Sequence, residues 1–329
     1  MDILLTGGAG YIGSHVCLDL IDNGHKVTVI DNLIKGNKFL IPKKARFIQS
    51  DISDIKKIDN VLKKNKFDAL MHFASFIEVE ESIKFPNKYF ENNTQNAIKF
   101  FETCLNNNLE NIIFSSTAAI YGNTNSHMLI SEKNILKPIN PYGESKLKTE
   151  QFILNVKKNN YNYIILRYFN VAGADPKMRS GLISDKPTHL IKIACEAATG
   201  KRENVLINGT DYNTPDGSPI RDYIHVSDLA EIHVKALEYM VKNNQSEIFN
   251  CGYGKGYSVK EVLKTTNKIT KNKVKIINGP RRKGDAEFVV SNPSKLKQMI
   301  DWNPKYNKLE YIIQTGIDWE LKLKNEKIS

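Results

Sequence analysis

The chain has 329 residues and a mass of 37.4 kDa, which is enough for a large buried core and for two lobes. Hydrophobic residues make up 41% and charged residues 25% of the sequence, so a disordered or fibrous protein is excluded. The formal net charge is +11, but the lysines are spread along the chain and form no basic tract with interleaved aromatic residues. We therefore expect no nucleic-acid partner.

The sequence also disfavours a disulfide framework, a metal site and a membrane or secretory location. The four cysteines are scattered without a CxxC pattern, and the seven histidines lack the spacing of metal ligands. No apolar run is long enough to cross a membrane, and no basic leader precedes the first apolar stretch. We expect a cytoplasmic protein with reduced thiols, no metal and no membrane association.

Short β-rich strands alternate with longer amphipathic segments through the first half of the chain. This alternation predicts an α/β protein with a Rossmann-type, doubly wound parallel sheet. The expected strands are buried on both faces and cover 2–6, 26–30, 45–49, 68–73, 111–116 and 163–168. The expected helices cover 11–23, 54–64, 86–108 and 142–159.

After about residue 170, loops rich in Gly, Pro, Asp and Asn separate shorter elements, which predicts a smaller α/β lobe. Segments 225–240 and 246–252 are expected to return to the large sheet. The predicted division is therefore a Rossmann domain of 1–168 plus about 222–250, and a smaller lobe of about 169–221 plus 251–329.

The segment TGGAGYIG follows the first strand and opens the first helix. It contains Gly8-x-Gly10-x-x-Gly13 and also Gly7-x-x-Gly10-x-x-Gly13. Such glycines allow a tight turn and let the backbone approach a pyrophosphate at the helix N-terminus. Asp31 ends the second strand, where a carboxylate can bind a ribose diol and would repel a 2′-phosphate. The segment therefore predicts an NAD site.

Polar residues at the carboxyl ends of the other strands are placed beside this cofactor. Asp51 ends the third strand and is expected near the adenine, while HFA at 72–74 and SST at 115–117 end the fourth and fifth strands. In PYGESK, Asn140 can cap a helix that starts at Pro141, and Tyr142 and Lys146 then lie one turn apart on one face. Taken alone, such a pair is more often an ordinary surface pair than part of a site.

Read together, these motifs resemble the extended short-chain dehydrogenase/reductase family, in its nucleotide-sugar 4-epimerase branch. The resemblance covers essentially the whole chain and includes TGGAGYIG, Asp31-Asn32, HFA, SST…YG, PYGESK, LRYFNVAGA (166–174), RDYIHVSDLA (221–230) and PRRKGD (280–285). It implies reversible 4-epimerisation of UDP-hexoses, UDP-glucose/UDP-galactose and also UDP-GlcNAc/UDP-GalNAc, with tightly bound NAD.

The resemblance implies roles for three catalytic residues. Tyr142 would take the proton of the sugar 4-hydroxyl, which Thr117 would hold, while C4 delivers hydride to NAD. Free tyrosine has a pKa near 10, so a pKa near 7 requires about 4 kcal/mol of preferential phenolate stabilisation. Lys146 and the positive nicotinamide ring are the two cations that could provide it.

The resemblance also implies two sets of binding residues. The cofactor-binding set is Gly7, Gly10, Tyr11, Ile12, Gly13, Asp31, Asn32, Asp51, Ile52, Phe73, Ala74, Asn92, Ser115, Tyr142, Lys146 and Tyr168. The set that would hold the UDP-sugar is Thr117, Tyr142, Asn170, His189, Leu190, Leu206, Asn208, Arg221, Tyr223, Arg282, Asp285 and Val289. Within it, the two arginines would clamp the diphosphate.

Three positions bear on differences within the family. Ile77 stands where many relatives have a lysine near the cofactor phosphates, so retention of the cofactor is in question. His189 is expected either to contact a phosphate or to be a buried, satisfied histidine. Val289 falls at the gatekeeper of the sugar pocket, where a bulky tyrosine excludes a 2-acetamido group, so valine predicts that N-acetylated sugars are accepted.

The same residues bear on alternative functions. Ala118 and Ala119 follow Thr117 and cannot move protons, which disfavours 4,6-dehydration. A UDP-glucuronate 4-epimerase, a decarboxylase, or a non-catalytic NAD- or nucleotide-sugar-binding regulator remain open. The extra apolar residues of helices 86–108 and 142–159 favour a homodimer, as the family pairs its equivalent helices.

Overall fold

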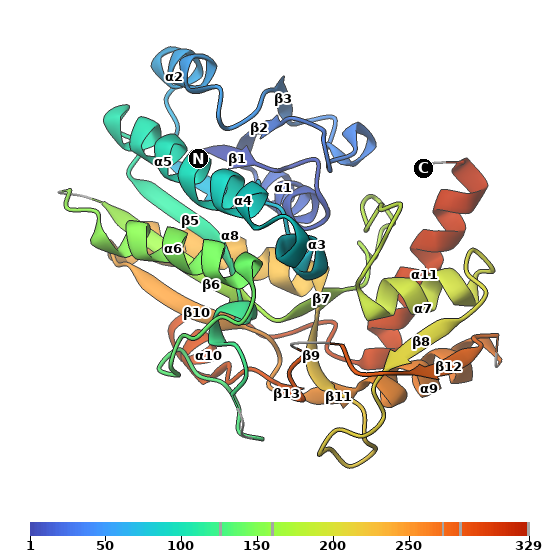
Figure 1. The fold of residues 1–329 in the computed structure, drawn as a ribbon. Coiled ribbons are helices and arrows are strands. Elements are labelled where there is room, and N and C mark those ends of the chain that lie inside the picture. The colour runs from blue at the N-terminus through green and yellow to red at the C-terminus, as the bar shows by residue number, and fades with distance from the viewer. Residues whose placement is uncertain (125–126, 159–160, 272, 283–284, 328–329) are drawn as a thin grey trace.

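The computed structural model describes residues 1–124, 127–158, 161–271, 273–282 and 285–327. A large parallel sheet lies between two layers of helices, and a smaller lobe that includes the C-terminal helix stands beside it (Figure 1). No helix in these ranges is long and apolar enough to span a membrane. The four cysteines are free and buried.

The large sheet has seven parallel strands in the order β10-β6-β5-β4-β1-β2-β3. The chain runs outward from β1 in both directions, so the gap between β1 and β4 is the point where the strand order reverses. The predicted fold and all six predicted strands of the first half are confirmed, and the segment 246–252 does return to this sheet. The strands are β1 (Asp2–Thr6), β2 (Lys26–Asp31), β3 (Arg46–Gln49), β4 (Ala69–His72), β5 (Asn111–Thr117), β6 (Asn162–Tyr168) and β10 (Glu247–Cys251).

Alternating residues of these strands fill two separate cores because successive side chains point to opposite faces. Ile3 and Leu5 pack against one helical layer, whereas Leu4 and Phe114 pack against the other. The first layer consists of α1 (Tyr11–Asp22) and α8 (Val226–Asn243). The second consists of α2 (Ile55–Lys64), α5 (Ala97–Asn106) and α6 (Pro141–Asn155).

The predicted continuous helix over 86–108 is interrupted. The structure has α3 (Val79–Lys84), α4 (Pro86–Tyr89), a π-helical segment η2 (Phe90–Asn96) and then α5. Thr94 donates to the Ser145 carbonyl at 2.9 Å, and Thr149 donates to the Asn93 carbonyl at 2.7 Å. These contacts join η2 to α6 and accompany a local departure from α-helical geometry, a kind of departure that is frequent at functional sites.

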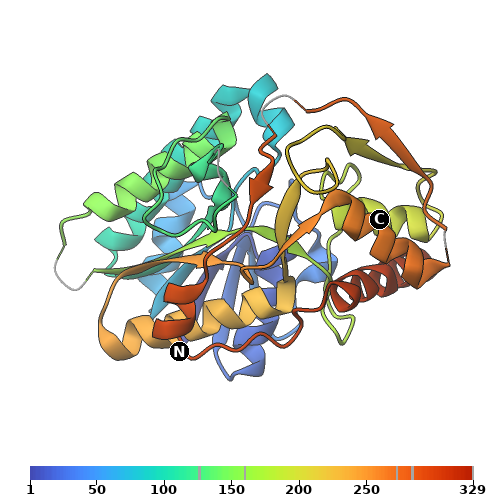
Figure 2. The ribbon, with the colours of Figure 1, turned by 90° about the horizontal axis from the view of Figure 1, so that it is seen from below.

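The smaller lobe is built around β9 (Ile220–His225), which pairs with β7 (Asn170–Ala172) and β13 (Phe288–Val289) in parallel and with β11 (Gly256–Ser258) antiparallel. β8 (Val205–Asn208) and β12 (Ile276–Gly279) form a second parallel pair. Figure 2 shows the red helix α11 in this lobe, on the side away from the green helix α6. The remaining helices are α7 (Leu190–Ala198), α9 (Val259–Thr270), α10 (Ser294–Met299) and α11 (Leu309–Glu326), with short 3-10 turns η1 (Lys38–Leu40) and η3 (Ala118–Tyr121).

Candidate active site

The turn between β1 and α1 leaves no space for side chains at two of its glycines. Gly7 has a φ of 74°, and a Cβ atom there would lie 2.6 Å from the Ala74 nitrogen. A Cβ atom on Gly13 would lie 2.3 Å from the Gly7 carbonyl oxygen. α1 begins after Gly10, and no side chain caps its first amides. The turn thus presents a bare backbone at a helix N-terminus, which suits an anionic group such as a pyrophosphate.

The Asp31 carboxylate is held by the backbone at the end of β2. Its Oδ2 accepts from the Ala9 amide at 3.0 Å and its Oδ1 from the Leu33 amide at 2.9 Å. Burial raises the pKa of Asp31, and these two hydrogen bonds offset part of that effect. The carboxylate is therefore fixed in position beside the glycine-rich turn, where a ribose diol would fit.

Asn32 and Asp51 meet at the ends of neighbouring strands. Asn32 Nδ2 donates to Asp51 Oδ2 at 2.6 Å, and the Ser53 amide donates to Asp51 Oδ1 at 2.8 Å. Although burial acts to raise it, these hydrogen bonds hold the pKa of Asp51 below its ordinary value. By contrast, Ile52 is only 4% exposed and its side chain belongs to the core.

The catalytic candidates come together at the carboxyl end of β5. α6 begins at Pro141, and Asn140 caps it by accepting from the Gly143 amide at 2.8 Å, as the sequence predicted. Lys146 is 2% exposed, and its Nζ donates to the Ser115 carbonyl at 2.7 Å. Tyr142, one turn earlier, shares a hydrogen bond with Thr117 of β5. The Thr117 hydroxyl also accepts from the Ala119 amide at 3.1 Å, which fixes its position.

Burial changes the proton affinities of both titratable candidates. It raises the pKa of the Tyr142 phenol, and the hydrogen bond with Thr117 offsets part of this. It lowers the pKa of Lys146 to about 7, although the Glu150 carboxylate opposes the shift. The ammonium also lies 4.9 Å from the centre of the Phe114 ring. The protein alone therefore does not lower the phenol's pKa, so the second cation considered from the sequence, the nicotinamide ring, would have to do so.

Aromatic residues border this end of the sheet. The Tyr168 hydroxyl pairs with His233 Nε2, and the Phe73 ring lies 5.1 Å from the His233 ring. Burial raises the pKa of Tyr168, while a hydrogen bond with Ser115 acts in the opposite direction. Asn92 lies in the π-helical segment and donates to Asn93 at 3.0 Å. Tyr11 reaches the smaller lobe, where its hydroxyl donates to the Gly173 carbonyl at 2.6 Å.

Two of the expected diphosphate and ribose ligands contact each other. Arg221 Nη2 donates to Asp285 Oδ1 and to the Ala286 carbonyl, both at 2.5 Å. Arg282 is not part of this pair. Its side chain is 42% exposed and forms an ion pair of 3.1 Å with Glu80 of α3. Lys283 and Gly284, the remaining positions of PRRKGD between Arg282 and Asp285, lie outside the described residues.

The other expected substrate residues are spread over the smaller lobe. Asn170 begins β7, and Tyr223 lies buried in β9. His189 occupies the N-cap position of α7, where its side chain makes no capping hydrogen bond. Burial lowers the pKa of His189, and the charge of Glu78 acts in the opposite direction. Leu190 begins α7, and Leu206 and Asn208 belong to β8, where Leu206 is 46% exposed.

Val289 and Ile77 are in contrasting surroundings. Val289 packs against a cluster that includes Ala118, Tyr121 and Phe169. Ala118 directly follows Thr117 in the sequence. Ile77 is 51% exposed, and the adjacent Glu78 forms an ion pair of 2.9 Å with Lys35. The gatekeeper candidate therefore lies at the catalytic end of β5, whereas Ile77 brings no charge to the cofactor side.

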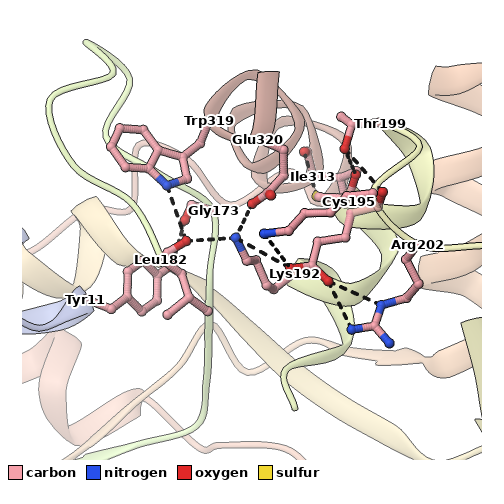
Figure 3. Close-up of polar contacts among 12 residues, drawn as sticks. Tyr11, Gly173, Leu182, Lys192, Cys195, Thr199, Arg202, Ile313, Trp319 and Glu320 are labelled. Carbon is pink, nitrogen blue, oxygen red and sulfur yellow. Dashed lines mark hydrogen bonds and ion pairs between the residues drawn. The ribbon is translucent and has the colours of Figure 1, made fainter. Parts of the chain in front are cut away.

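The motifs did not predict a buried ion cluster around Lys192 and Glu320, which Figure 3 shows. Lys192 Nζ donates to the Leu182 carbonyl at 2.9 Å and to the Glu320 carboxylate, and it lies 3.9 Å from Glu196 Oε1. The cluster joins α7 to α11 and lines a small cavity with Asn170, His189 and Tyr223. The signal in the sequence was Lys192 and Glu196 at i,i+4 spacing in an otherwise apolar helix.

The motifs also did not predict a second buried ion pair, between Glu150 and Arg167. Glu150 lies one turn after Lys146 on α6. The signal for this pair in the sequence was a lone arginine in the apolar strand β6. Within the described ranges, no group of three or more His, Cys, Asp or Glu side chains could hold a metal ion.

Comparison with known proteins gives one consistent answer. Residues 3–252 match the model of the NAD dependent epimerase/dehydratase family. The chain is 44% identical over 322 residues to the UDP-glucose 4-epimerase of Azospirillum brasilense, covering 98% of this chain and 92% of that protein.

Two solved structures agree over almost the whole length. The UDP-glucose 4-epimerase of Stenotrophomonas maltophila, solved with bound NAD and formylated UDP-arabinopyranose, superposes with a TM-score of 0.95 at 31% identity, covering 99% of each chain. The UDP-Glc/GlcNAc 4-epimerase of Campylobacter jejuni superposes with a TM-score of 0.85 at 44% identity, covering 98% of this chain and 99% of that one. The chain therefore belongs to the NAD dependent epimerase/dehydratase family, in the branch of the UDP-glucose 4-epimerases.

Proposed function

We propose that this protein interconverts the C4 epimers of UDP-hexoses by transient oxidation at C4, with NAD as its resident cofactor. The observation that carries the proposal is the cluster of Thr117, Tyr142 and Lys146 at the carboxyl end of β5. The names of the relatives favour this reaction over the uronate 4-epimerase, decarboxylase and non-catalytic alternatives.

The residues around the glycine-rich turn fit NAD. Gly7 and Gly13 let the turn pack closely on its own backbone, so that bare amides face the pyrophosphate position. Asp31 would accept from the adenosine ribose, and Lys146 would bind the nicotinamide ribose. When bound, NAD would supply the reversible hydride acceptor that oxidation at C4 requires.

Tyr142 is the proposed base. It would remove the proton from the sugar 4-hydroxyl and give it back when the 4-keto sugar has turned over in the site. Thr117 would hold the same oxygen, since its hydroxyl is already fixed by the Ala119 amide. Lys146 would keep a positive charge one helical turn from the phenolate.

The smaller lobe would hold the UDP group. Arg221 and Arg282 carry guanidinium forks that match phosphate oxygens, and Asp285 would accept from the uridine ribose. Both arginines form ion pairs with carboxylates, Arg221 with Asp285 and Arg282 with Glu80, so a phosphate would compete with an anionic partner at each. Asn170, His189, Leu190, Leu206, Asn208 and Tyr223 are the further proposed contacts.

The proposal is tested with purified protein and no added NAD. Conversion of UDP-galactose to UDP-glucose, followed by NMR, is expected to proceed on retained cofactor. Tyr142→Phe should lower kcat by about 10²- to 10⁴-fold, because proton transfer is lost while the shape of the site is kept. NAD released on denaturation should be equal in the two proteins. Epimerisation by Tyr142→Phe at the wild-type rate would refute the proposed role of the phenol.

A second prediction concerns substrate range. Val289→Tyr should reduce kcat/KM for UDP-GalNAc by about 5- to 150-fold, which corresponds to about 1–3 kcal/mol of overpacking. Turnover of UDP-galactose should change little, and Val289→Ala, which enlarges the pocket, should accept both sugars. Equal loss for both sugars in Val289→Tyr would remove the gatekeeper argument.

A third prediction follows from the buried amine. The folded-state pKa of Lys146 is about 7, below the 10.5 of the unfolded chain, so its contribution to stability is present at high pH and is lost as the pH falls through 7. Between pH 7 and 9, NAD-free wild-type protein should gain about 1–3 kcal/mol of unfolding free energy relative to Lys146→Met. Urea unfolding at each pH measures this. Lys148→Met, on the exposed side of α6, is the control and should show no such pH dependence.

We also propose that the protein is a cytoplasmic homodimer. The apolar side chains of Phe85 and Leu154, at the α3–α4 junction and on α6, are 60% and 41% exposed and would be covered by a second copy. Light scattering at micromolar concentration should give twice the 37.4 kDa chain mass. A monomeric mass would contradict the dimer without touching the reaction.

A further inference from the structure

A fully buried ion pair joins α6 to β6, one helical turn beyond Lys146. Glu150 is 0% exposed and Arg167 2% exposed. Arg167 Nε donates to Glu150 Oε1 at 3.1 Å and Nη2 donates to Oε2 at 2.7 Å, so the guanidinium and the carboxylate meet through two parallel hydrogen bonds. This arrangement permits only one relative orientation of the two side chains.

The remaining polar atoms of the pair are also occupied. The Ser116 hydroxyl donates to Glu150 Oε1. Arg167 Nη1 donates to the Tyr121 hydroxyl at 2.9 Å, and that hydroxyl donates to Asn250 Oδ1 at 2.7 Å. The network therefore connects α6, β5, β6, η3 and β10 without an unpaired charge.

Three members of the network, Glu150, Ser116 and Arg167, lie close in the sequence to candidate site residues. Glu150 follows Lys146 by one turn of α6, Ser116 separates Ser115 from Thr117, and Arg167 precedes Tyr168. Ser116 and Arg167 are also direct partners in the β5–β6 register. Successive side chains of a strand point to opposite faces. The Glu150–Arg167 pair therefore lies on the face that α6 covers, while Tyr168 points to the opposite face and contacts His233 of α8.

We propose that Glu150 and Arg167 are positioning residues for the reaction, because their fork sets the rotation and height of α6, and thus of Tyr142 and Lys146, relative to Thr117 on β5. This inference rests on the proposed function. Cohesion alone does not require the pair, because buried ion pairs can often be replaced by apolar side chains of similar volume without loss of stability. An apolar pair would not, however, impose one orientation on the helix.

Glu150 has a second effect, on the charge of Lys146. The groups that contact or act on this ammonium are Glu150 on α6, the Ser115 carbonyl and the Phe114 ring on β5, and His72 on β4. Tyr142 lies one turn earlier on α6. Burial, followed by the charge of Lys146, lowers the pKa of His72 to about 3, so that ring stays neutral. Glu150 is thus the only one of these groups that carries a negative charge while the phenol is protonated, and it favours the charged lysine.

The first test separates an effect on the orientation of α6 from an effect on the stability of the fold. The double variant Glu150→Leu with Arg167→Met should fold and retain NAD, but its kcat for UDP-galactose should fall by 10-fold or more with KM within about 3-fold, since the reacting groups are less well aligned. Arg167→Lys, which keeps the charge and loses the fork, should give an intermediate kcat. The matched control removes Lys295–Glu247, an ion pair between α10 and β10 at the opposite end of the sheet, by Lys295→Met with Glu247→Gln, and should keep wild-type kinetics.

The second test reads the charge of Lys146. In NAD-free Glu150→Gln, the rise in stability that begins near pH 7 in the wild type should begin at a lower pH, and the alkaline limb of kcat should move the same way. If the double variant does not fold, Glu150→Gln and Ser116→Ala decide the question by the same readouts. If the wild type is active and the Glu150, Arg167 and Ser116 variants keep its kcat and its pH profile, the positioning role is overturned. An inactive wild type would instead refute the proposed function.

Discussion

The burial of the Lys146 amine is the constraint on which the rest of the candidate site depends. Only 2% of this side chain is exposed. A pKa lowered from 10.5 to about 7 corresponds to a net penalty of roughly 5 kcal/mol on the charged form, which is what remains of a larger desolvation cost. The Ser115 carbonyl, the Phe114 ring and the Glu150 carboxylate each recover part of that cost. Because all three lie on β5 or α6, the strand and the helix must hold one fixed relation for the amine to remain there.

The parallel sheet explains why this site and the cofactor site adjoin. β5 and β1 both end at the same edge, with β4 between them, so Thr117 and the glycine-rich turn open on one side of the molecule. Gly7 can approach Ala74 at the end of β4 only because neither a side chain nor an ordinary φ is required of it. The same edge faces the smaller lobe through the Tyr11–Gly173 hydrogen bond.

Carboxylates occupy the guanidinium groups that would hold the substrate. Arg221 pairs with Asp285 while only 13% exposed, whereas Arg282 pairs with Glu80 at the surface. The surface pair contributes little to stability because it is solvated, so it can be exchanged for a phosphate at small cost. The more buried pair is already oriented, which favours the proposal that it positions the UDP group rather than simply attracting it.

Local features of the site could be read from the sequence. The glycine-rich turn, the Asn140 cap and the i,i+4 relation of Tyr142 and Lys146 involve residues close together in the chain, and the structure has all three as predicted. The strand pattern was equally readable because strands buried on both faces leave continuous apolar runs. The sequence and its family resemblance also supplied the site residues, whose individual roles stay predictions.

What only the tertiary structure decided involves partners that are distant in sequence. The π-helical segment depends on hydrogen bonds between η2 and α6, about fifty residues apart, and no local pattern encodes them. The Lys192–Glu320 contact joins residues 128 positions apart. The Glu150–Arg167 fork likewise exists only once β5, β6 and α6 have packed. A sequence sets local conformation through nearby atoms, whereas the desolvation and pairing of a buried charge depend on which distant segments fold around it.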